Sequence, residues 1–497
     1  MLSARTITGL TVAILLALVA AWLSIRGASA SAPRRPNIVL IVADDMSWHD
    51  GQAYGSLDVP TPNMMRLAHE GMAFDRAFQA TAMCAVTRHQ LYTGLDPVHS
   101  GAYPQHSWAD PGTKSVFGYL QALGYRVGLT GKTHVGPAGS FPWEFLGDAG
   151  GAAGGVDENL PPVDLKAVEA FVARDARQPF FVVVASHRPH APWKYGDASK
   201  FDAAKLHVPP YLVDTPATRE SLRHYYADIT VLDGEVGQVL DILDRHGVAQ
   251  NTLVIFTSEQ GSSVPFAKWT LYDAGVRTEM IARWPGHVKP GTRTGTMVSY
   301  EDVTPTFIQA AGGQPPKGLD GISFLPVLMG ATTTHRSYVF GIHTNLGIIG
   351  GEPYPIRSVR DERYKLIRNL MPNDPYKNVL NNTKEGDRVI KDWEAAAAAG
   401  NRFAAQRLAA YNQRPATELY DLSTDPWEMH NRADDPGLSG VRRRLQVELD
   451  RWMAQQADSG IPKEMQAFKH INPAIIRFIN EHYPDSARNP DGTKIHP

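Results

Sequence analysis

The sequence predicts an α/β fold in which a large, mostly parallel sheet is sandwiched by helices, with a smaller C-terminal α+β domain after it. The first observation is a set of continuous apolar runs without polar alternation, at residues 37–42, 125–129, 180–184 and 253–256. Helical patterns lie between these runs, for example at 62–71 and 163–177. Apolar strands that alternate with helices are typical of a parallel sheet that is covered on both faces.

The composition is that of a globular protein with room for a large core. The chain has 497 residues, of which 43% are hydrophobic and 20% charged. Its 49 basic and 51 acidic side chains give a net charge of −2, which argues against a constitutive nucleic-acid binder. The single cysteine, Cys84, excludes an intrachain disulfide framework and a cysteine-based zinc cluster.

Residues 1–32 predict that the chain is exported. Arg5 precedes an uncharged apolar run over 6–25, and the small residues Ala28-Ser29-Ala30 follow it in a pattern that a signal peptidase cuts. The run also has about the 20 residues needed to span a bilayer, so a cleaved signal peptide and an uncleaved membrane anchor both stay open. We expect a periplasmic, secreted or membrane-anchored protein, whose only contact with a membrane is through this segment.

Residues 33–335 are expected to form the larger domain, in which polar side chains follow the predicted strands. The four segments are Ala43-Asp44-Asp45, Thr130-Gly131-Lys132-Thr133-His134, Ala185-Ser186-His187-Arg188-Pro189-His190 and Thr257-Ser258-Glu259-Gln260-Gly261. In an open α/β sheet, ligands bind beyond the carboxyl ends of the strands. Groups that carry out chemistry at four such ends predict that the chain is an enzyme.

The acidic strand ends suggest a cation site. Adjacent Asp44 and Asp45 are either solvated turn residues or partners of a cation, because two buried carboxylates repel each other. Glu259 and Gln260 offer further oxygen ligands, and oxygen ligands favour Ca²⁺ or Mg²⁺ over zinc.

The other candidate residues each have a structural alternative. Lys132 and His134 are two residues apart and point the same way in an extended loop, but a Lys-x-His pair by itself is usually a chance occurrence. His190, with prolines on both sides, is either a surface-loop histidine or a site residue, and Lys268 is by default a solvated lysine. Cys84 is by default a small buried hydrophobe. Arg88 follows it at a helical i+4 spacing, and a helix N-terminus with an arginine makes an anion site.

Residues 336–497 are expected to form the smaller α+β domain. Short, more polar runs at 357–367 and 418–422 predict strands, and a helix is predicted over 438–456. The alanine-rich stretch over 395–411 predicts a surface helix.

Taken together, these motifs resemble those of the formylglycine-dependent (type I) sulfatases of the alkaline phosphatase superfamily. The resemblance covers roughly residues 36–436, and its motifs fall in the family's order. They are the Asp44-Asp45 strand end, Cys84-Ala-Val-Thr-Arg88 with Leu91-Tyr92-Thr93-Gly94, Gly131-Lys132-x-His134, Pro189-His190-x-Pro192, Thr257-Ser258-Glu259-Gln260-Gly261, Lys268 with Gly275-Val276-Arg277, Leu319-Asp320-Gly321, and Glu418-Leu-Tyr-Asp-Leu422. Residues 268–285 and 364–370 most resemble the heparan N-sulfatase-like branch.

The resemblance implies a role for each candidate. Cys84 would be oxidised by a formylglycine-generating enzyme, and one oxygen of the resulting gem-diol would attack sulfur. Asp44, Asp45, Glu259, Gln260 and the modified Cys84 would hold the cation, Ca²⁺ or else Mg²⁺. Arg88, Lys132 and Lys268 would neutralise the sulfate oxygens, His190 would protonate the leaving group, and His134 would take a proton from the second diol oxygen.

Three hypotheses follow from this resemblance. The first is a sulfatase that removes a sulfate ester or sulfamate from a sulfated carbohydrate. The second is a phosphonate or phosphodiester hydrolase of the same superfamily. The third is a non-catalytic protein that binds sulfated glycans and keeps Cys84 as a thiol; its support is Val86, where the family usually has proline or alanine. Specificity is expected in the loops at 140–162 and 342–355, where His343 and Glu352 are candidates for sugar contacts.

Overall fold

The computed structural model describes residues 35–147, 160–381 and 388–482, and its main element is an eight-stranded sheet. The strand order is β4-β3-β5-β1-β6-β7-β2-β8. The strands are β1 (Asn37–Ala43), β2 (Met72–Phe78), β3 (Arg126–Gly131), β4 (Glu144–Phe145), β5 (Phe180–Ala185), β6 (Thr252–Ser258), β7 (Arg277–Arg283) and β8 (Thr292–Ser299). Strand β7 is antiparallel to both of its neighbours, and the other adjacent pairs are parallel. The predicted mostly parallel sheet is confirmed.

Strand β1 is buried on both faces, which explains why its sequence shows no polar alternation. Val39, Ile41 and Ala43 pack into one apolar core, and the alternate residues of the strand pack into the other. Successive side chains of a strand point to opposite faces, so both faces of this strand must be apolar.

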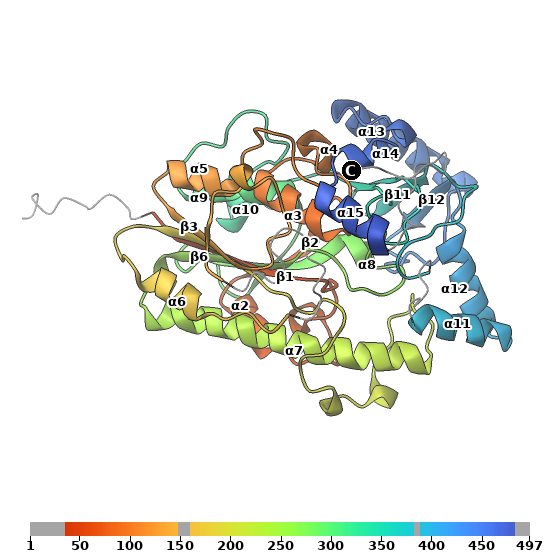
Figure 1. Cartoon of the computed structure of the whole chain (residues 1–497), viewed down its shortest axis with the longest axis horizontal. Helices are drawn as coiled ribbons and strands as arrows, with labels where there is room; N and C mark the ends of the chain where they lie inside the picture. The colour runs from red at the N-terminus through yellow and green to blue at the C-terminus, as the bar shows by residue number, and fades with distance from the viewer. Residues whose placement is uncertain (1–34, 148–159, 382–387, 483–497) are drawn as a thin grey trace, which may run out of the picture. The chain divides into compact units, whose positions relative to one another are not determined.

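Helices cover both faces of the sheet (Figure 1). On one side lie α2 (Pro62–His69), α6 (Lys166–Ala173) and the long α7 (Pro216–Arg245), and on the other lie α3 (Cys84–Thr93), α5 (Val116–Ala122), α9 (Val303–Ala310) and α10 (Leu325–Leu328). Helix α7 begins where the Thr215 side chain accepts a hydrogen bond from the Thr218 N–H and proline occupies the first helical position. The predicted helices at 62–71 and 163–177 are present with shorter bounds.

A second, four-stranded antiparallel sheet follows in the C-terminal part, with the order β12-β11-β10-β9. Its strands are β9 (Val339–His343), β10 (Ile356–Arg360), β11 (Tyr364–Asn369) and β12 (Thr417–Asp421). Helix α13 (Ser439–Gln455) packs on this sheet through Leu445, Leu449 and Trp452. The smaller α+β region is confirmed, although the predicted strand at 357–367 is a hairpin of two strands.

The predicted helix over 395–411 is two helices, α11 (Arg388–Ala398) and α12 (Arg402–Asn412). Gly400 separates them with a φ of +96°, a conformation that glycine adopts at little cost. Two short helices, α14 (Ile461–Glu464) and α15 (Pro473–His482), close the described chain.

Two expectations lie wholly or partly outside the described residues: the export segment at 1–32, and the centre of the loop at 140–162. Within the part of the chain that the structure describes, no helix is both long and apolar enough to cross a bilayer.

The apolar core beneath α7 continues into the C-terminal region, where it includes Ile356 and Trp393.

Candidate active site

The candidate site lies where β1 and β6 end at the same edge of the sheet. Asp44 and Asp45 follow β1, and Glu259 and Gln260 follow its neighbour β6. None of these four residues is more than 1% exposed. Asp45 has a φ of +71°, which is uncommon for a residue with a side chain and marks a constrained turn.

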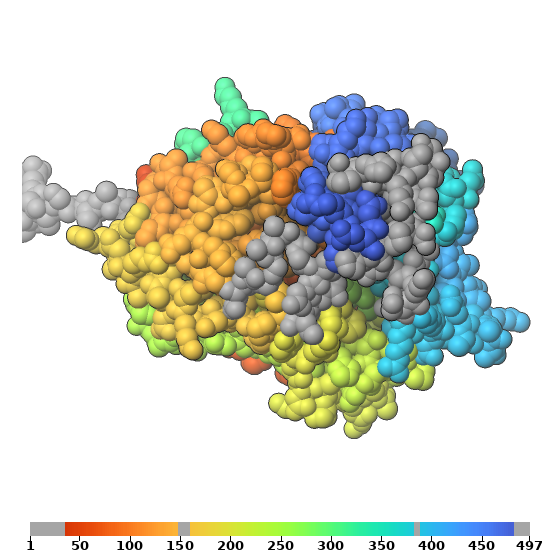
Figure 2. All heavy atoms as spheres, in the orientation of Figure 1, coloured from red at the N-terminus to blue at the C-terminus, as the bar shows by residue number. Residues whose placement is uncertain are grey.

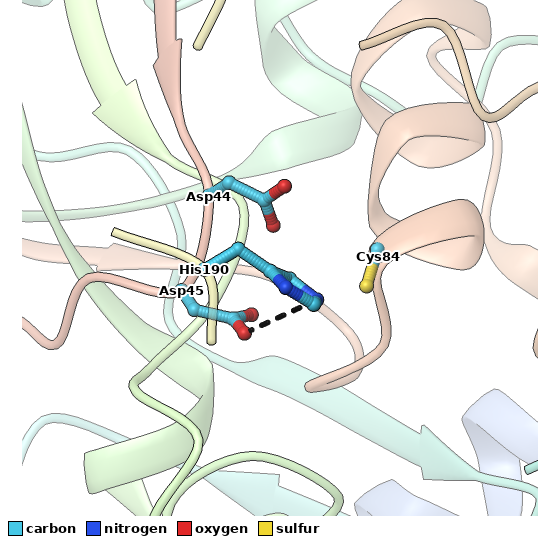
Figure 3. Close-up of side chains that lie close together, drawn as sticks. All are labelled: Asp44, Asp45, Cys84 and His190. Carbon is cyan, nitrogen blue, oxygen red and sulfur yellow. Dashed lines mark ion pairs between the residues drawn. The ribbon is translucent and has the colours of Figure 1, made fainter. Parts of the chain in front are cut away.

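Cys84 is the first residue of helix α3, and all ten residues of that helix are buried. In Figure 3 the side chains of Asp44, Asp45 and His190 gather opposite the Cys84 thiol. The possible ligand atoms of these four residues all lie within 4.8 Å of one another. The Gln260 amide donates to Asp45 Oδ1 at 2.6 Å and to Cys84 Sγ at 3.3 Å. The cysteine is therefore part of the acidic cluster.

Three basic side chains pair with the three acidic ones. Lys132 Nζ lies 2.5 Å from Asp44 Oδ2, and Lys268 Nζ lies 2.7 Å from Asp45 Oδ2. Arg88, one turn into helix α3, pairs with Glu259 through Nε. Lys268 is 2% exposed and Arg88 is fully buried, so the solvated-lysine interpretation of Lys268 is wrong.

Gly131 directs Lys132 into the site. This residue ends β3 with a φ of +80°, and a Cβ there would lie 2.0 Å from the Ala185 carbonyl oxygen. Only glycine fits so close to the β5 backbone. The Lys132 N–H donates to the same carbonyl, which fixes the start of the loop that carries Lys132 and His134.

The surrounding bases favour ionisation of Cys84. Burial by itself raises the pKa of a thiol, but Lys132 and Lys268, with hydrogen bonds from His134 and His190, hold the pKa of Cys84 well below its usual range. The cysteine therefore lies in an electropositive environment and is not a simple apolar filler.

His190 lies between the acids and Lys268. Its Nε2 is 3.1 Å from Lys268 Nζ and 3.6 Å from Asp45 Oδ2. Burial and Lys268 lower the pKa of His190, but Asp44 and Asp45 outweigh them and raise it above its usual value. The two carboxylates therefore make this ring easier to protonate than an exposed histidine, which suits a proton donor.

The acidic cluster fits a hard divalent cation. Asp44 Oδ1 and Gln260 Oε1 are buried oxygen atoms without a hydrogen-bond partner in the protein, and buried polar atoms are rarely left so. Carboxylate and amide oxygens are ligands that Ca²⁺ and Mg²⁺ prefer. The Glu259 carboxylate pairs with Arg88. A ring nitrogen of His190, by contrast, lies within 4.8 Å of the possible ligand atoms of Asp44, Asp45 and Cys84.

The structure brings every predicted site residue into one place and adds two that the motifs do not indicate. Gln105 donates to Cys84 Sγ at 3.6 Å, and the Ser263 hydroxyl donates to Asp45 Oδ2 at 2.6 Å. Ser263 lies two residues beyond the Glu259-Gln260-Gly261 motif, which is a usable signal, whereas nothing in the sequence around Gln105 marks it.

The two candidates for sugar contacts both have partners within the protein. His343 is fully buried with its Nε2 3.2 Å from Asn345 Oδ1, so it offers a sugar no exposed surface. Glu352 pairs with Lys377 at 2.8 Å.

Comparison with known proteins identifies the family. A family model described as Sulfatase matches residues 36–313, and one described as N-sulphoglucosamine sulphohydrolase, C-terminal, matches residues 261–388. The chain belongs to the sulfatase family. The predicted enzyme class, a sulfuric ester hydrolase, is confirmed, and so is the predicted likeness to the N-sulfatase branch.

Individual relatives agree with this assignment. This sulfatase is 33% identical over 433 residues to an ulvan-active sulfatase of Formosa agariphila, covering 86% of this chain and 82% of the relative. It is 29% identical over 491 residues to human N-sulphoglucosamine sulphohydrolase, covering 88% of this chain and 93% of the relative. A solved structure bound to its substrate D-glucosamine-2-N,6-O-disulfate shares the fold with a TM-score of 0.66 at 20% identity, covering 86% of this chain and 99% of that one.

Proposed function

We propose that this sulfatase removes a sulfate ester or sulfamate group from a sulfated carbohydrate, using a formylglycine made from Cys84 and a bound Ca²⁺. The observation that carries the proposal is the position of Cys84: it starts a buried helix and faces two carboxylates, two lysines and two histidines. The relatives act on ulvan and, by name, on N-sulphoglucosamine, which makes an anionic polysaccharide the substrate class to test first.

The cation would be held by oxygen atoms of Asp44, Asp45, Glu259 and Gln260. Two of these atoms, Asp44 Oδ1 and Gln260 Oε1, have no hydrogen-bond partner in the protein. Mg²⁺ is the alternative ion, although the flexible coordination of Ca²⁺ suits the long Glu259 and Gln260 side chains better. Formylglycine at position 84 would supply an aldehyde hydrate as the nucleophile, beside a cation that polarises it.

The positions of the basic side chains support this proposal. Arg88, Lys132 and Lys268 each pair with an acid of the cluster that surrounds Cys84. There they would neutralise the sulfate oxygens as charge builds on them. His190 would donate a proton to the leaving oxygen or nitrogen. His134, which hydrogen-bonds the Cys84 side chain, would accept a proton from the group at that position.

Two measurements test the proposal. The mass of the peptide that contains Cys84, from protein made in its native host, should show conversion of the thiol to the aldehyde. The same sample should release sulfate from ulvan oligosaccharides or glucosamine-2-N-sulfate, and the Cys84→Ala variant should not. An unmodified cysteine with retained binding of sulfated glycans would contradict the proposal and support the binding-protein hypothesis.

Matched substrates separate the proposal from the phosphonate or phosphodiester alternative. An aryl sulfate and the monoester of phenylphosphonic acid with the same aryl group release the same phenol. We expect the ratio of kcat/KM to favour the sulfate, and a ratio that favours the phosphonate would reverse the assignment.

We also propose that the chain is exported, on the basis of the apolar run at 6–25 and the small residues that follow it. The N-terminal sequence of the protein recovered from its host tests this proposal. A start near residue 31 would indicate a cleaved signal peptide, whereas an intact N-terminus in the membrane fraction would indicate an anchor.

A further inference from the structure

A small cavity lies beside His134. Its walls include His106, Ser107, His134 and Asn472, and its volume is about 20 Å³. A cavity of this volume has room for one water molecule, provided that polar groups face it.

Two buried polar atoms of the cavity walls have no hydrogen-bond partner in the protein. They are His134 Nδ1 and Ser107 Oγ. Since His134 hydrogen-bonds the Cys84 side chain and its Nδ1 has no partner, Nε2 is the nitrogen that faces Cys84. A histidine that accepts a proton at Nε2 must carry its own proton on Nδ1, and that N–H needs an acceptor.

His106 supplies an acceptor on the same cavity wall. Its ring centroid lies 5.1 Å from that of His134, with the ring planes at 42°. His106 Nδ1 lies 3.0 Å from the Gly347 carbonyl oxygen, so Nδ1 carries the proton and Nε2 keeps the lone pair. Burial and the neighbouring His134 lower the pKa of His106 to about 3, which keeps this ring neutral.

The backbone fixes the segment that carries these residues. His106 has a φ of +60° and His134 a φ of +47°, both uncommon for residues with side chains. Asn472 N donates to His106 O at 3.0 Å, Trp108 N donates to His470 O at 2.9 Å, and Ser107 forms an isolated antiparallel bridge with Ile471. Figure 2 shows the C-terminal segment, in blue, packed against the orange region of the chain that includes Ser107.

We propose that one water molecule in this cavity joins His134 Nδ1 to His106 Nε2 and Ser107 Oγ. His106 and Ser107 are then positioning residues that hold His134 in the tautomer with its proton on Nδ1 and its lone pair on Nε2, toward Cys84. The water site rests on the cavity and its polar walls, and the tautomer rests also on the approach of Nε2 to Cys84. Its effect on catalysis rests on the proposed function.

The test is the side-chain ¹⁵N NMR spectrum of His134 in the full chain, assigned by loss of its signals in the His134→Gln variant. We expect the Nδ1–H tautomer in the wild type. His106→Phe keeps a ring but removes the acceptor, and Ser107→Ala removes one oxygen atom, so both should shift His134 toward the other tautomer. His106→Gln restores an acceptor and should retain most of the wild-type signal. Ser115→Ala is the matched control, because its buried hydroxyl donates to Ser140 O and does not line the cavity.

Kinetics on the same variants give a second, separate readout. If the enzyme releases sulfate, His106→Phe should lower kcat about tenfold with KM unchanged, as is common when the partner of a catalytic histidine is lost. An unchanged His134 tautomer in both His106→Phe and Ser107→Ala would overturn the inference even in an active enzyme. The predicted tautomer shifts in a protein that releases no sulfate would support the inference and overturn the proposed function.

Discussion

At the scale of single residues, the site is defined by charges that balance one another. Asp44, Asp45 and Glu259 face Lys132, Lys268 and Arg88, so the three acids and three bases have a formal charge of zero. A divalent cation added alone, or a sulfate dianion added alone, would leave two uncompensated charges in a buried place, which is unfavourable. Together they preserve the balance.

This balance predicts that Ca²⁺ and inorganic sulfate bind cooperatively. We expect each to raise the affinity for the other by about tenfold, within the usual range of coupling between two sites. Calorimetric titration of sulfate with and without Ca²⁺ measures the effect. Lys268→Met removes one positive charge, so it should weaken sulfate binding and strengthen Ca²⁺ binding. Independent binding of the two ions would contradict the prediction.

His343 predicts a different effect, on stability against pH. Burial lowers the pKa of this fully buried ring to about 3, against 6.5 for an exposed histidine. The unfolded chain therefore binds more protons between pH 6.5 and about 3, so stability is full above pH 6.5 and is lost as the pH falls. The loss should be about 1.4 kcal/mol per pH unit.

Denaturant unfolding at pH 7 and pH 5 tests this prediction. The wild type should lose more stability between the two pH values than His343→Gln, which keeps a hydrogen-bonding side chain but does not titrate. Equal losses in the two proteins would mean that His343 is not the group responsible.

At the scale of elements, the strand ends decide where the site lies, and two glycines of similar conformation show how. Gly131 and Gly124 have φ values of +80° and +87°, but only at Gly131 would a Cβ meet backbone, 2.0 Å from Ala185 O. At Gly124 no atom lies within 4 Å of that position.

The two alanine variants should therefore differ. Gly124→Ala should cost about 1 kcal/mol, the cost of the positive φ alone. Gly131→Ala adds a collision that must move β3 away from β5, so it should cost about 3 kcal/mol and displace Lys132. Unfolding free energies and sulfate affinity check both statements. Similar losses in the two variants would show that the backbone at Gly131 yields easily.

The sequence predicts the elements that end in the site better than it predicts contacts between side chains. Apolar runs identify β1, β3, β5 and β6, and most of the site residues follow these strands, whereas Cys84 and Arg88 lie on helix α3. The sequence does not predict that Glu259 pairs with Arg88 while His190 approaches Asp45, because such pairing depends on distances between elements. His106 and Gln105 lie in a loop without a motif, so only the fold places them beside His134 and Cys84.

At the scale of the whole molecule, a buried charge network joins the second sheet to the first. Asp273, at the start of α8 (Asp273–Val276), pairs with Arg360 of β10 at 2.5 Å and with Lys365 of β11 at 2.8 Å. Lys365 also pairs with Glu428 at 3.0 Å. The three pairs are nearly inaccessible to solvent, and Arg360 and Lys365 hold the pKa of Asp273 below its usual range despite burial.

Asp273→Asn should destabilise the protein by about 3–5 kcal/mol, because it leaves two buried cations short of a partner. Asp450→Asn is the control, since Asp450 and its partner Arg368 are 57% and 34% exposed and such pairs contribute about 1 kcal/mol or less. Because both sheets share one apolar core, circular dichroism and tryptophan fluorescence should report the same unfolding transition. Two separate transitions would mean that the sheets unfold independently.

The complete burial of helix α3 has a consequence for the order of events in the life of the chain. Cys84 is 2% exposed, and every other residue of its helix is buried as well. An enzyme that alters this side chain must reach it, and the finished fold leaves almost none of it accessible. Any such alteration therefore belongs to the time before folding is complete, and a chain that folds first keeps its thiol permanently.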